Sequence, residues 1–312
     1  MTPVAVAPGV LAGAPAEYQL PATPPTLDEA KAWCRKLATT HYENFHVATW
    51  FLPKKVRLHF ESVYAYCRVS DDLGDEVADA STALRLLDEW GVMLDECYDA
   101  PEQSRHPVFV ALHETIAACN LPRQLFHDLL TAFKLDQTKT RFESIAELEE
   151  YSRNSANPVG RLVLLVSGYR EEQIARLSDK ICTALQLANF WQDVVEDWER
   201  GRRYLPGDLM HQFGVRDADV EARSFTPEFR ALMEHLVADT REMLREGGTI
   251  SKLVDPELAT TLDLFRKGGE AILDAIAAQG YDTLKQRPQV SKMRKARLLA
   301  GAVWSKGIGV RA

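Results

Sequence analysis

The sequence lacks the cysteine patterns that stabilise small extracellular proteins. Its five cysteines are scattered along the chain, odd in number and never spaced as C-x-x-C: Cys34, Cys67, Cys97, Cys119 and Cys182. Such spacing provides neither a disulfide framework nor a zinc site. We therefore expect a protein of the reducing cytoplasm.

The sequence also lacks long apolar runs, alternating strand patterns, internal repeats and a glycine-rich dinucleotide fingerprint. No apolar run approaches the length of a membrane span. The formal net charge of −8, from 45 acidic and 37 basic residues, argues against a surface built for nucleic acid. An anionic substrate would therefore need local compensation by metal ions or clustered arginines.

The first 25 residues differ in composition from the rest of the chain. They hold six of the fifteen prolines and a single charge, Glu17. Because they have no basic start and no long apolar core, a disordered leader is expected here instead of a signal peptide. The predicted domain then spans residues 26–312.

Helix signals recur throughout that domain. Thr26-x-x-Glu29 and Ser144-x-x-Glu147 are capping boxes. Thr226-Pro227 and Asp255-Pro256 each combine an N-cap with proline at the first helical position. Glycines stand where helices should stop, at Gly214, Gly247 and Gly280. With no domain-sized linker after residue 26, we predict one all-α domain.

A first acidic cluster ends the apolar-periodic segment 56–76. At about 100° per residue, Asp75 lies about 40° from Asp71, and Arg68, Tyr64 and Arg57 fall within about 60° on the same face. Carboxylates four residues apart can hold hard cations through oxygen, and arginines along the same face can bind phosphate. A helix end with solvated acids and local ion pairs is the structural alternative.

A second acidic cluster lies on segment 177–198, which is apolar on nearly all sides. The polar exceptions Gln186, Asn189, Asp193 and Asp197 share one face. Buried carboxylates are costly unless they are paired or bound to metal. Arg202 and Tyr204 follow closely and could cover a departing diphosphate. A buried salt-bridge network or a capped helix end is the alternative.

Together the two clusters describe a coherent site. Magnesium held by both rows could bridge a diphosphate and absorb the charge that develops as it leaves. A non-catalytic helical binding module that keeps the acids as ion pairs remains the alternative of a different class.

Two long motifs resemble those of the squalene/phytoene synthase family. The first is Tyr64-x-x-x-Arg68-x-x-Asp71-x-x-x-Asp75, and the second runs from Gln186 through Asn189, Asp193 and Asp197 to Gly201-Arg202-x-Tyr204-Leu205-Pro206. The segment from Tyr151 to Gly160 is similar to the middle motif of that family, and its Pro158 and Gly160 suggest a helix break. The likeness covers roughly residues 27–300.

The resemblance implies the head-to-head prenyl synthase fold, a helical bundle around a central cavity. It implies Mg²⁺ at Asp71, Asp75, Asn189, Asp193 and Asp197. It also implies phosphate contacts from Arg57, Arg68 and Arg202, with Tyr64 and Tyr151 near the carbocation and Asp72 and Glu76 in lesser roles. Aromatic candidates to line the cavity are Phe45, Trp50, Phe51, Phe190 and Trp191, for each of which core packing is the alternative.

Within the family, segment 43–53 and segment 182–193 look like the hydroxysqualene synthase branch of hopanoid-making bacteria. Such enzymes take presqualene diphosphate, expel diphosphate and capture the rearranged cation with water. The alternative is a squalene, dehydrosqualene or phytoene synthase that condenses two prenyl diphosphates. The apolar substrate suggests a transient contact with the inner-membrane surface.

Overall fold

The fold is helical, as the capping signals predict. The computed structural model describes residues 9–40 and 54–309. These residues contain no β-strand, and one isolated β-bridge among them joins Arg141 to Arg203. The predicted all-α class is therefore confirmed.

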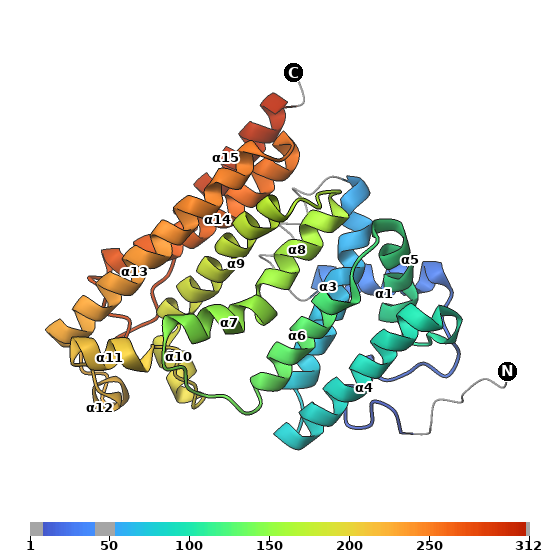
Figure 1. Cartoon of the computed structure of the whole chain (residues 1–312), viewed down its shortest axis with the longest axis horizontal. Coiled ribbons are helices and arrows are strands. Elements are labelled where there is room, and N and C mark those ends of the chain that lie inside the picture. The colour runs from blue at the N-terminus through green and yellow to red at the C-terminus, as the bar shows by residue number, and fades with distance from the viewer. Residues whose placement is uncertain (1–8, 41–53, 310–312) are drawn as a thin grey trace. The chain divides into compact units, whose positions relative to one another are not determined.

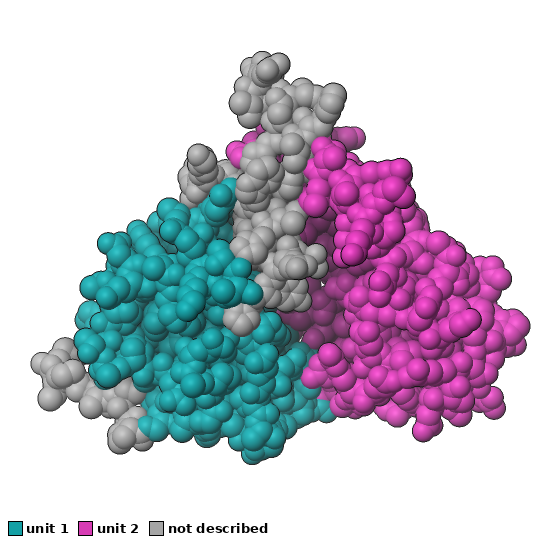
Figure 2. All heavy atoms as spheres, turned by 180° about the vertical axis from the view of Figure 1, so that it is seen from behind, with its two compact units in different colours: residues 1–138, 161–170 teal, residues 139–160, 171–312 magenta. Residues whose placement is uncertain are grey.

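The chain divides into two compact units, coloured separately in Figure 2. Unit 1 comprises residues 1–138 and 161–170, and unit 2 comprises residues 139–160 and 171–312. Each unit buries a hydrophobic interior of its own. That residues 26–312 act as one domain stays a prediction.

Unit 1 is built around a central helix that ends in the first acidic cluster (Figure 1). Its helices are α1 (Leu27–Thr40), α3 (Lys54–Asp75), α4 (Ala80–Asp99), α5 (Pro107–Cys119), α6 (Arg123–Leu135) and the end of α8 (Asn157–Val166), with the short helices η1 (Ala16–Tyr18) and η2 (Pro101–Gln103). Helix α3 packs against α1, α4, α5 and α6. Its Tyr66 ring meets Phe126 edge-on at 5.0 Å and stacks near Trp90 at 6.1 Å. This aromatic contact fixes which face of α3 is buried.

The predicted disordered leader is wrong for residues 9–25. Leu11 and Tyr18 are fully buried in unit 1. The Leu11 N–H donates to Glu89 at 2.6 Å, and the ring of His106 hydrogen-bonds to the Tyr18 carbonyl at 3.2 Å. Two buried apolar anchors and these hydrogen bonds outweigh a proline-rich composition. Residues 1–8 lie outside the described residues.

Unit 2 is likewise built around the helix that leads into the second acidic cluster (Figure 1). Its elements are α7 (Ile145–Ser155), the start of α8, α9 (Glu172–Gln192), α10 (Val194–Glu199), α11 (Gly207–Phe213), α12 (Asp217–Glu221), α13 (Pro227–Gly247), η3 (Gly248–Lys252), α14 (Pro256–Ala278) and α15 (Lys292–Gly309). Helix α9 packs against α7, α13 and α14. Trp191 at its end is fully buried and donates its indole N–H to Thr240 at 2.8 Å. Of the two interpretations of Trp191, the cavity wall and the core, the structure supports the core of unit 2.

The helix boundaries agree with the local signals. Thr26, Ser144, Thr226 and Asp255 all act as N-caps, and Gly214 ends α11 with a positive φ of 78°. The predicted break near Pro158 falls at Ala156, between α7 and α8. Proline in the first turn costs no helical hydrogen bond, because the first N–H groups of a helix have no partner there.

No helix in the described part of the chain is both long and apolar enough to cross a lipid bilayer.

Candidate active site

The first acidic cluster lies at the end of α3, on an unbroken helix. Arg57, Tyr64, Arg68, Asp71 and Asp75 all belong to α3, so the predicted spacing is retained. Asp75 is exposed, and the side chain of Asp71 is 47% exposed. The structure thus places the row of acids at the boundary of unit 1, where a ligand can reach it.

The carboxylates of this row crowd one another. Burial and the neighbouring charge of Asp75 raise the pKa of Asp71 to about 6, although Arg68 opposes the shift. A carboxyl group whose pKa rises in this way is short of positive charge. A bound divalent cation would supply that charge, and carboxylate oxygens are the donors that Mg²⁺ prefers.

Arg68, expected to contact phosphate, is held by acids of its own helix. Its Nε donates to Asp72 at 2.9 Å, and its Nη2 forms an ion pair with the same carboxylate. Nη1 lies 3.6 Å from Asp71, and Nη2 lies 3.4 Å from Glu76. The guanidinium therefore lies between the more exposed acids, Asp71 and Glu76, and the buried Asp72, which fixes its orientation.

Asp72 has a larger role than the sequence indicated. Its side chain is 2% exposed, and it accepts hydrogen bonds from Arg68 and from the hydroxyl of Tyr18. Burial and the Asp72 carboxylate both raise the pKa of Tyr18, so this hydroxyl stays protonated and can donate. Tyr18 was missed because it belongs to the segment predicted to be disordered.

The second acidic row spans a break between two helices. Helix α9 ends at Gln192 and α10 starts at Val194, so Asp193 stands at the junction with φ −104° and ψ 20°. The backbone hydrogen bonds from Asp193 to Asn189, at 2.9 Å, and from Asp197 to Asp193, at 2.8 Å, keep the helical spacing across it. The row therefore retains one face, although the sequence predicted a single continuous helix.

Arg287 binds Asp193 and was not found by sequence reasoning. Its Nε lies 2.5 Å from Oδ1 of Asp193, and one Nη lies 3.1 Å from Oδ2. The same guanidinium contacts Gln192 at 3.2 Å and Glu196 at 3.3 Å. Because Arg287 lies in an irregular segment between α14 and α15, no periodic pattern connects it with the acidic row.

Asp197 is the most perturbed acid of the second row. Burial and the charge of Asp193 raise its pKa to about 7, against the opposing charges of Arg200 and Arg202. Asp197, Arg202 and Tyr204 also line one small hollow. The structure thus brings together three residues that the sequence assigned to the site.

Arg203, the neighbour of Arg202, is engaged elsewhere. Its side chain is 10% exposed and forms ion pairs with Glu143 at 2.8 Å and Asp217 at 3.0 Å. Of these two adjacent arginines, Arg202 is therefore the one placed beside the acidic row.

An aromatic cluster adjoins the second row in unit 2. The ring of Tyr204 stacks on Phe190 with centroids 3.8 Å apart and planes inclined by 6°. Tyr151 lies 6.3 Å from Tyr204 and 6.2 Å from Phe190, and Phe142 completes the cluster. The tyrosine of the middle motif and that of the second motif are thus neighbours. Phe45, Trp50 and Phe51 and segment 43–53 lie outside the described residues.

Each row provides carboxylates in pairs. Nowhere in residues 9–40 and 54–309 do three or more His, Cys, Asp or Glu side chains gather as a preformed metal site. Asp71 with Asp75, and Asp193 with Asp197, nevertheless fit a cation that keeps most of its coordination sphere for water and phosphate. Such partial sites suit Mg²⁺, which dehydrates reluctantly.

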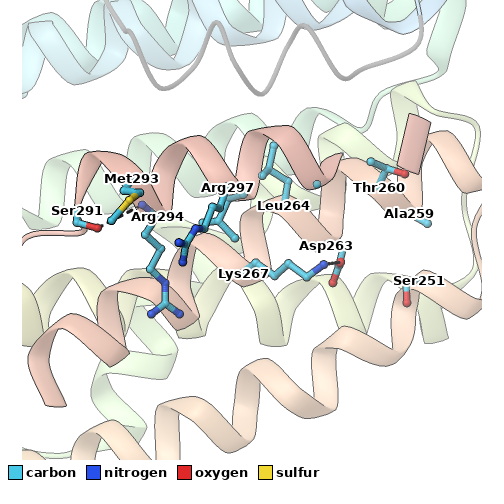
Figure 3. A pocket seen from close by; sticks show the side chains of 12 residues that line it. Ser251, Ala259, Thr260, Asp263, Leu264, Lys267, Ser291, Met293, Arg294 and Arg297 are labelled. Carbon is cyan, nitrogen blue, oxygen red and sulfur yellow. Dashed lines mark hydrogen bonds and ion pairs between the residues drawn. The ribbon is translucent and has the colours of Figure 1, made fainter. Parts of the chain in front are cut away.

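A separate hollow lies along α14 and α15 (Figure 3). Lys267, Arg294 and Arg297 line it together with the apolar Leu264 and Leu298, and Lys267 lies beside Asp263 in Figure 3. Its one acid, Asp263, is bound by Lys267 and Arg266. None of the residues of the two motifs lines this hollow, so the chemistry is assigned to the acidic rows.

Comparison with known proteins agrees with the two motifs. The family model described as "Squalene/phytoene synthase" matches residues 38–294. The chain belongs to the squalene/phytoene synthase family. It is therefore an enzyme of that family, whose members act on prenyl diphosphates.

Relatives within the squalene/phytoene synthase family differ in their products. A phytoene synthase of Thermus thermophilus is 31% identical over 268 residues, which cover 86% of this chain and 90% of the relative. A hydroxysqualene synthase of Rhodopseudomonas palustris is also 31% identical, over 248 residues that cover 78% and 82%. The crystal structure of squalene synthase HpnC from Alicyclobacillus acidocaldarius shares 41% identity, with a TM-score of 0.78 and coverage of 87% of this chain and 98% of that one. The isoprenoid synthase fold is thereby confirmed.

Proposed function

We propose that this enzyme ionises presqualene diphosphate and captures the rearranged cation with water, giving hydroxysqualene and diphosphate. The observation that supports the metal and diphosphate part of the proposal is the state of Asp71 and Asp197. Each is a partly buried carboxyl group with a second carboxylate beside it and a raised pKa. Purely structural ion pairs lower the pKa of their acids instead, as Arg141 and Arg203 do at Asp217.

We assign Mg²⁺ to Asp71 and Asp75 in unit 1, and to Asn189, Asp193 and Asp197 in unit 2. When bound, the metal neutralises the carboxylates and acts as a Lewis acid toward the diphosphate. Asn189 is exposed and Asp193 partly exposed, so ligand oxygens are accessible there. The fit rests on donor chemistry: oxygen ligands, two carboxylates per row and adjacent arginine.

The cationic side chains hold the leaving group in this proposal. Arg202 shares a hollow with Asp197 and remains positively charged at all physiological pH values. Arg57 and Arg68 lie on the same helix as Asp71. Their guanidinium groups can donate to phosphate oxygens and stabilise the charge that grows as the carbon–oxygen bond breaks.

The aromatic cluster suits the carbocation that forms when the carbon–oxygen bond breaks. A carbocation is attracted to the electron-rich faces of aromatic rings. Tyr204 and Phe190 stack face to face, and Tyr151 packs beside them, so the cluster is held in one arrangement. We assign Tyr151 and Tyr204 to stabilisation of the cation, and Tyr64 on α3 stays a candidate for the same role by the family resemblance.

The choice of product rests on the branch resemblance of segments 43–53 and 182–193 and on the hydroxysqualene synthase relative. A condensing enzyme that makes phytoene, squalene or dehydrosqualene is the second candidate. It is favoured by the phytoene synthase relative of equal identity and by the squalene synthase of known structure.

Product analysis separates the two candidates. Purified protein is incubated with Mg²⁺ and either presqualene diphosphate or farnesyl diphosphate, without a reductant, and the products are identified by mass spectrometry. Hydroxysqualene from presqualene diphosphate alone supports the proposal. Presqualene diphosphate or a C30 hydrocarbon from farnesyl diphosphate would support the condensing enzyme, and geranylgeranyl diphosphate is then tested for phytoene.

A further inference from the structure

The carboxylate of Asp72 connects the N-terminal segment, residues 9–25, with the first acidic row. It is shared by two donors: the hydroxyl of Tyr18 and the guanidinium of Arg68, whose Nε lies 2.9 Å away. All three side chains belong to unit 1, and Tyr18 is fully buried. A buried carboxylate needs such donors, because without them its desolvation is costly.

The hydroxyl of Tyr18, not its ring, makes this connection. The ring packs edge-on against Trp33 at 6.3 Å, a contact that phenylalanine would keep. The backbone of Tyr18 is fixed separately, since His106 hydrogen-bonds to its carbonyl at 3.2 Å. Loss of the hydroxyl would therefore remove one hydrogen bond to Asp72 and leave the segment in place.

Asp72 in turn determines how Arg68 is oriented. Two guanidinium nitrogens contact the Asp72 carboxylate, which leaves Nη1 directed toward Asp71 at 3.6 Å. If the Asp72 carboxylate rotates, the fork of donors on Arg68 must rotate with it, because the guanidinium is planar and rigid. The position of Arg68 beside Asp71 thus depends on a rotamer that Tyr18 helps to fix.

We propose that Tyr18 is a positioning residue for the diphosphate site. It acts through Asp72 on Arg68 and contacts neither of the assigned metal ligands Asp71 and Asp75. The N-terminal segment is then a structural part of the site. The inference rests on the proposed function, because that function assigns Arg68 to the diphosphate.

Substitution of two matched tyrosines tests the proposal. Tyr18→Phe removes the hydroxyl that reaches Asp72, whereas Tyr66→Phe removes an equally buried hydroxyl that donates to the Phe126 carbonyl at 3.1 Å. Binding of inorganic diphosphate in the presence of Mg²⁺ is measured for the whole protein by isothermal titration calorimetry, with a thermal melt for each variant. We expect roughly five- to tenfold weaker binding for Tyr18→Phe, because Arg68 is then less well placed to donate to the diphosphate, and near wild-type binding for Tyr66→Phe.

A double-mutant cycle shows whether the effect passes through Arg68. In an Arg68→Ala background, or Arg68→Lys if the alanine variant does not fold, Tyr18→Phe should cause no further loss of binding. An equal loss in both backgrounds, or equal binding by the two tyrosine variants, would overturn the proposal. If the wild-type protein does not bind magnesium diphosphate, the proposed function itself fails and the positioning role with it.

Discussion

Arg287 holds Asp193 with two of its nitrogens, at 2.5 and 3.1 Å, from a position 94 residues further along the chain. The acid at the junction of α9 and α10 therefore already has a cation as its partner. The pKa of the neighbouring Asp197 is nevertheless raised to about 7, because Asp197 is partly buried and lies close to the charge of Asp193. The second row is therefore still short of positive charge. Under the proposed function, a bound metal would add positive charge to the row in which Arg287 already holds Asp193.

Removal of Arg287 should make the protein more responsive to magnesium. Arg287→Gln loses a two-point charged hydrogen bond and should destabilise the metal-free protein by about 1 kcal/mol, a modest cost because the pair is partly exposed. Mg²⁺ can replace the missing charge, so its addition should raise the melting temperature of Arg287→Gln more than that of the wild type. Arg245→Gln, which breaks an exposed pair with Glu242, is the control. An equal rise in melting temperature with Mg²⁺ in all three proteins would contradict this expectation.

The two aspartates of the second row should be essential for turnover and dispensable for folding. Asp193→Asn and Asp197→Asn each keep the shape of the side chain and remove its charge, so we expect diphosphate release to fall by at least about 100-fold. The melting temperature should change little for Asp197→Asn, which relieves repulsion from Asp193, whereas Asp193→Asn should lose about 1 kcal/mol with its Arg287 ion pair and still fold. Asp239→Asn, on the exposed face of α13, should retain full activity. Activity that survives both substitutions would show that the metal assignment is wrong.

His106 should make the protein less stable in acid. The ring is fully buried among Trp33, Trp90 and Phe109, and burial lowers the pKa of His106 from 6.5 to about 3. Below pH 6.5 the unfolded chain takes up a proton that the folded protein cannot bind. The associated stability is therefore complete above pH 6.5 and is lost as the pH falls toward 3, by up to a few kcal/mol.

Urea unfolding of the wild type and His106→Asn measures this effect. Asparagine keeps an N-cap acceptor for Val108 but has no titratable ring. The difference in free energy of unfolding between the two proteins should shrink as the pH is lowered from 7 to 4.5. A difference that is constant with pH would mean that His106 is not buried in its neutral form.

Gly160 should tolerate no side chain. A Cβ atom there would lie 2.5 Å from Ser178 Oγ and 2.6 Å from Cys182 Sγ, where α8 meets α9. Gly160→Ala should therefore destabilise unit 2 by about 1–3 kcal/mol in chemical denaturation. Gly268→Ala, in a helical position with open space around it, should instead stabilise the protein by about 0.5–1 kcal/mol. A change in the free energy of unfolding of the same sign for both substitutions would contradict the packing described for Gly160.

The sequence predicted those features that depend on neighbours along the chain. The N-caps at Thr226 and Asp255 and the spacing of Asp71 and Asp75 depend only on helical geometry. The contacts of Tyr18 with Asp72 and of Arg287 with Asp193 join segments 54 and 94 residues apart. Neither has a local signature, because a tyrosine in a proline-rich segment and an arginine in a loop are each ordinary residues.

The break in the second row was also beyond prediction. The apolar pattern of residues 177–198 continues through Asp193, so periodicity indicated one helix. The structure interrupts it at Asp193, where Arg287 also binds. For Trp191, core packing was the stated alternative, and the structure bears it out.

In the proposed reaction, the carbon–oxygen bond of presqualene diphosphate breaks and water captures the cation. The direct test is turnover of presqualene diphosphate with Mg²⁺ in water enriched in oxygen-18, followed by mass spectrometry of the C30 product and of the released diphosphate. We expect hydroxysqualene that carries one oxygen-18 atom, with unlabelled diphosphate. An unlabelled C30 alcohol with label in the phosphate would show cleavage at phosphorus and would contradict the proposed reaction, as would a C30 hydrocarbon.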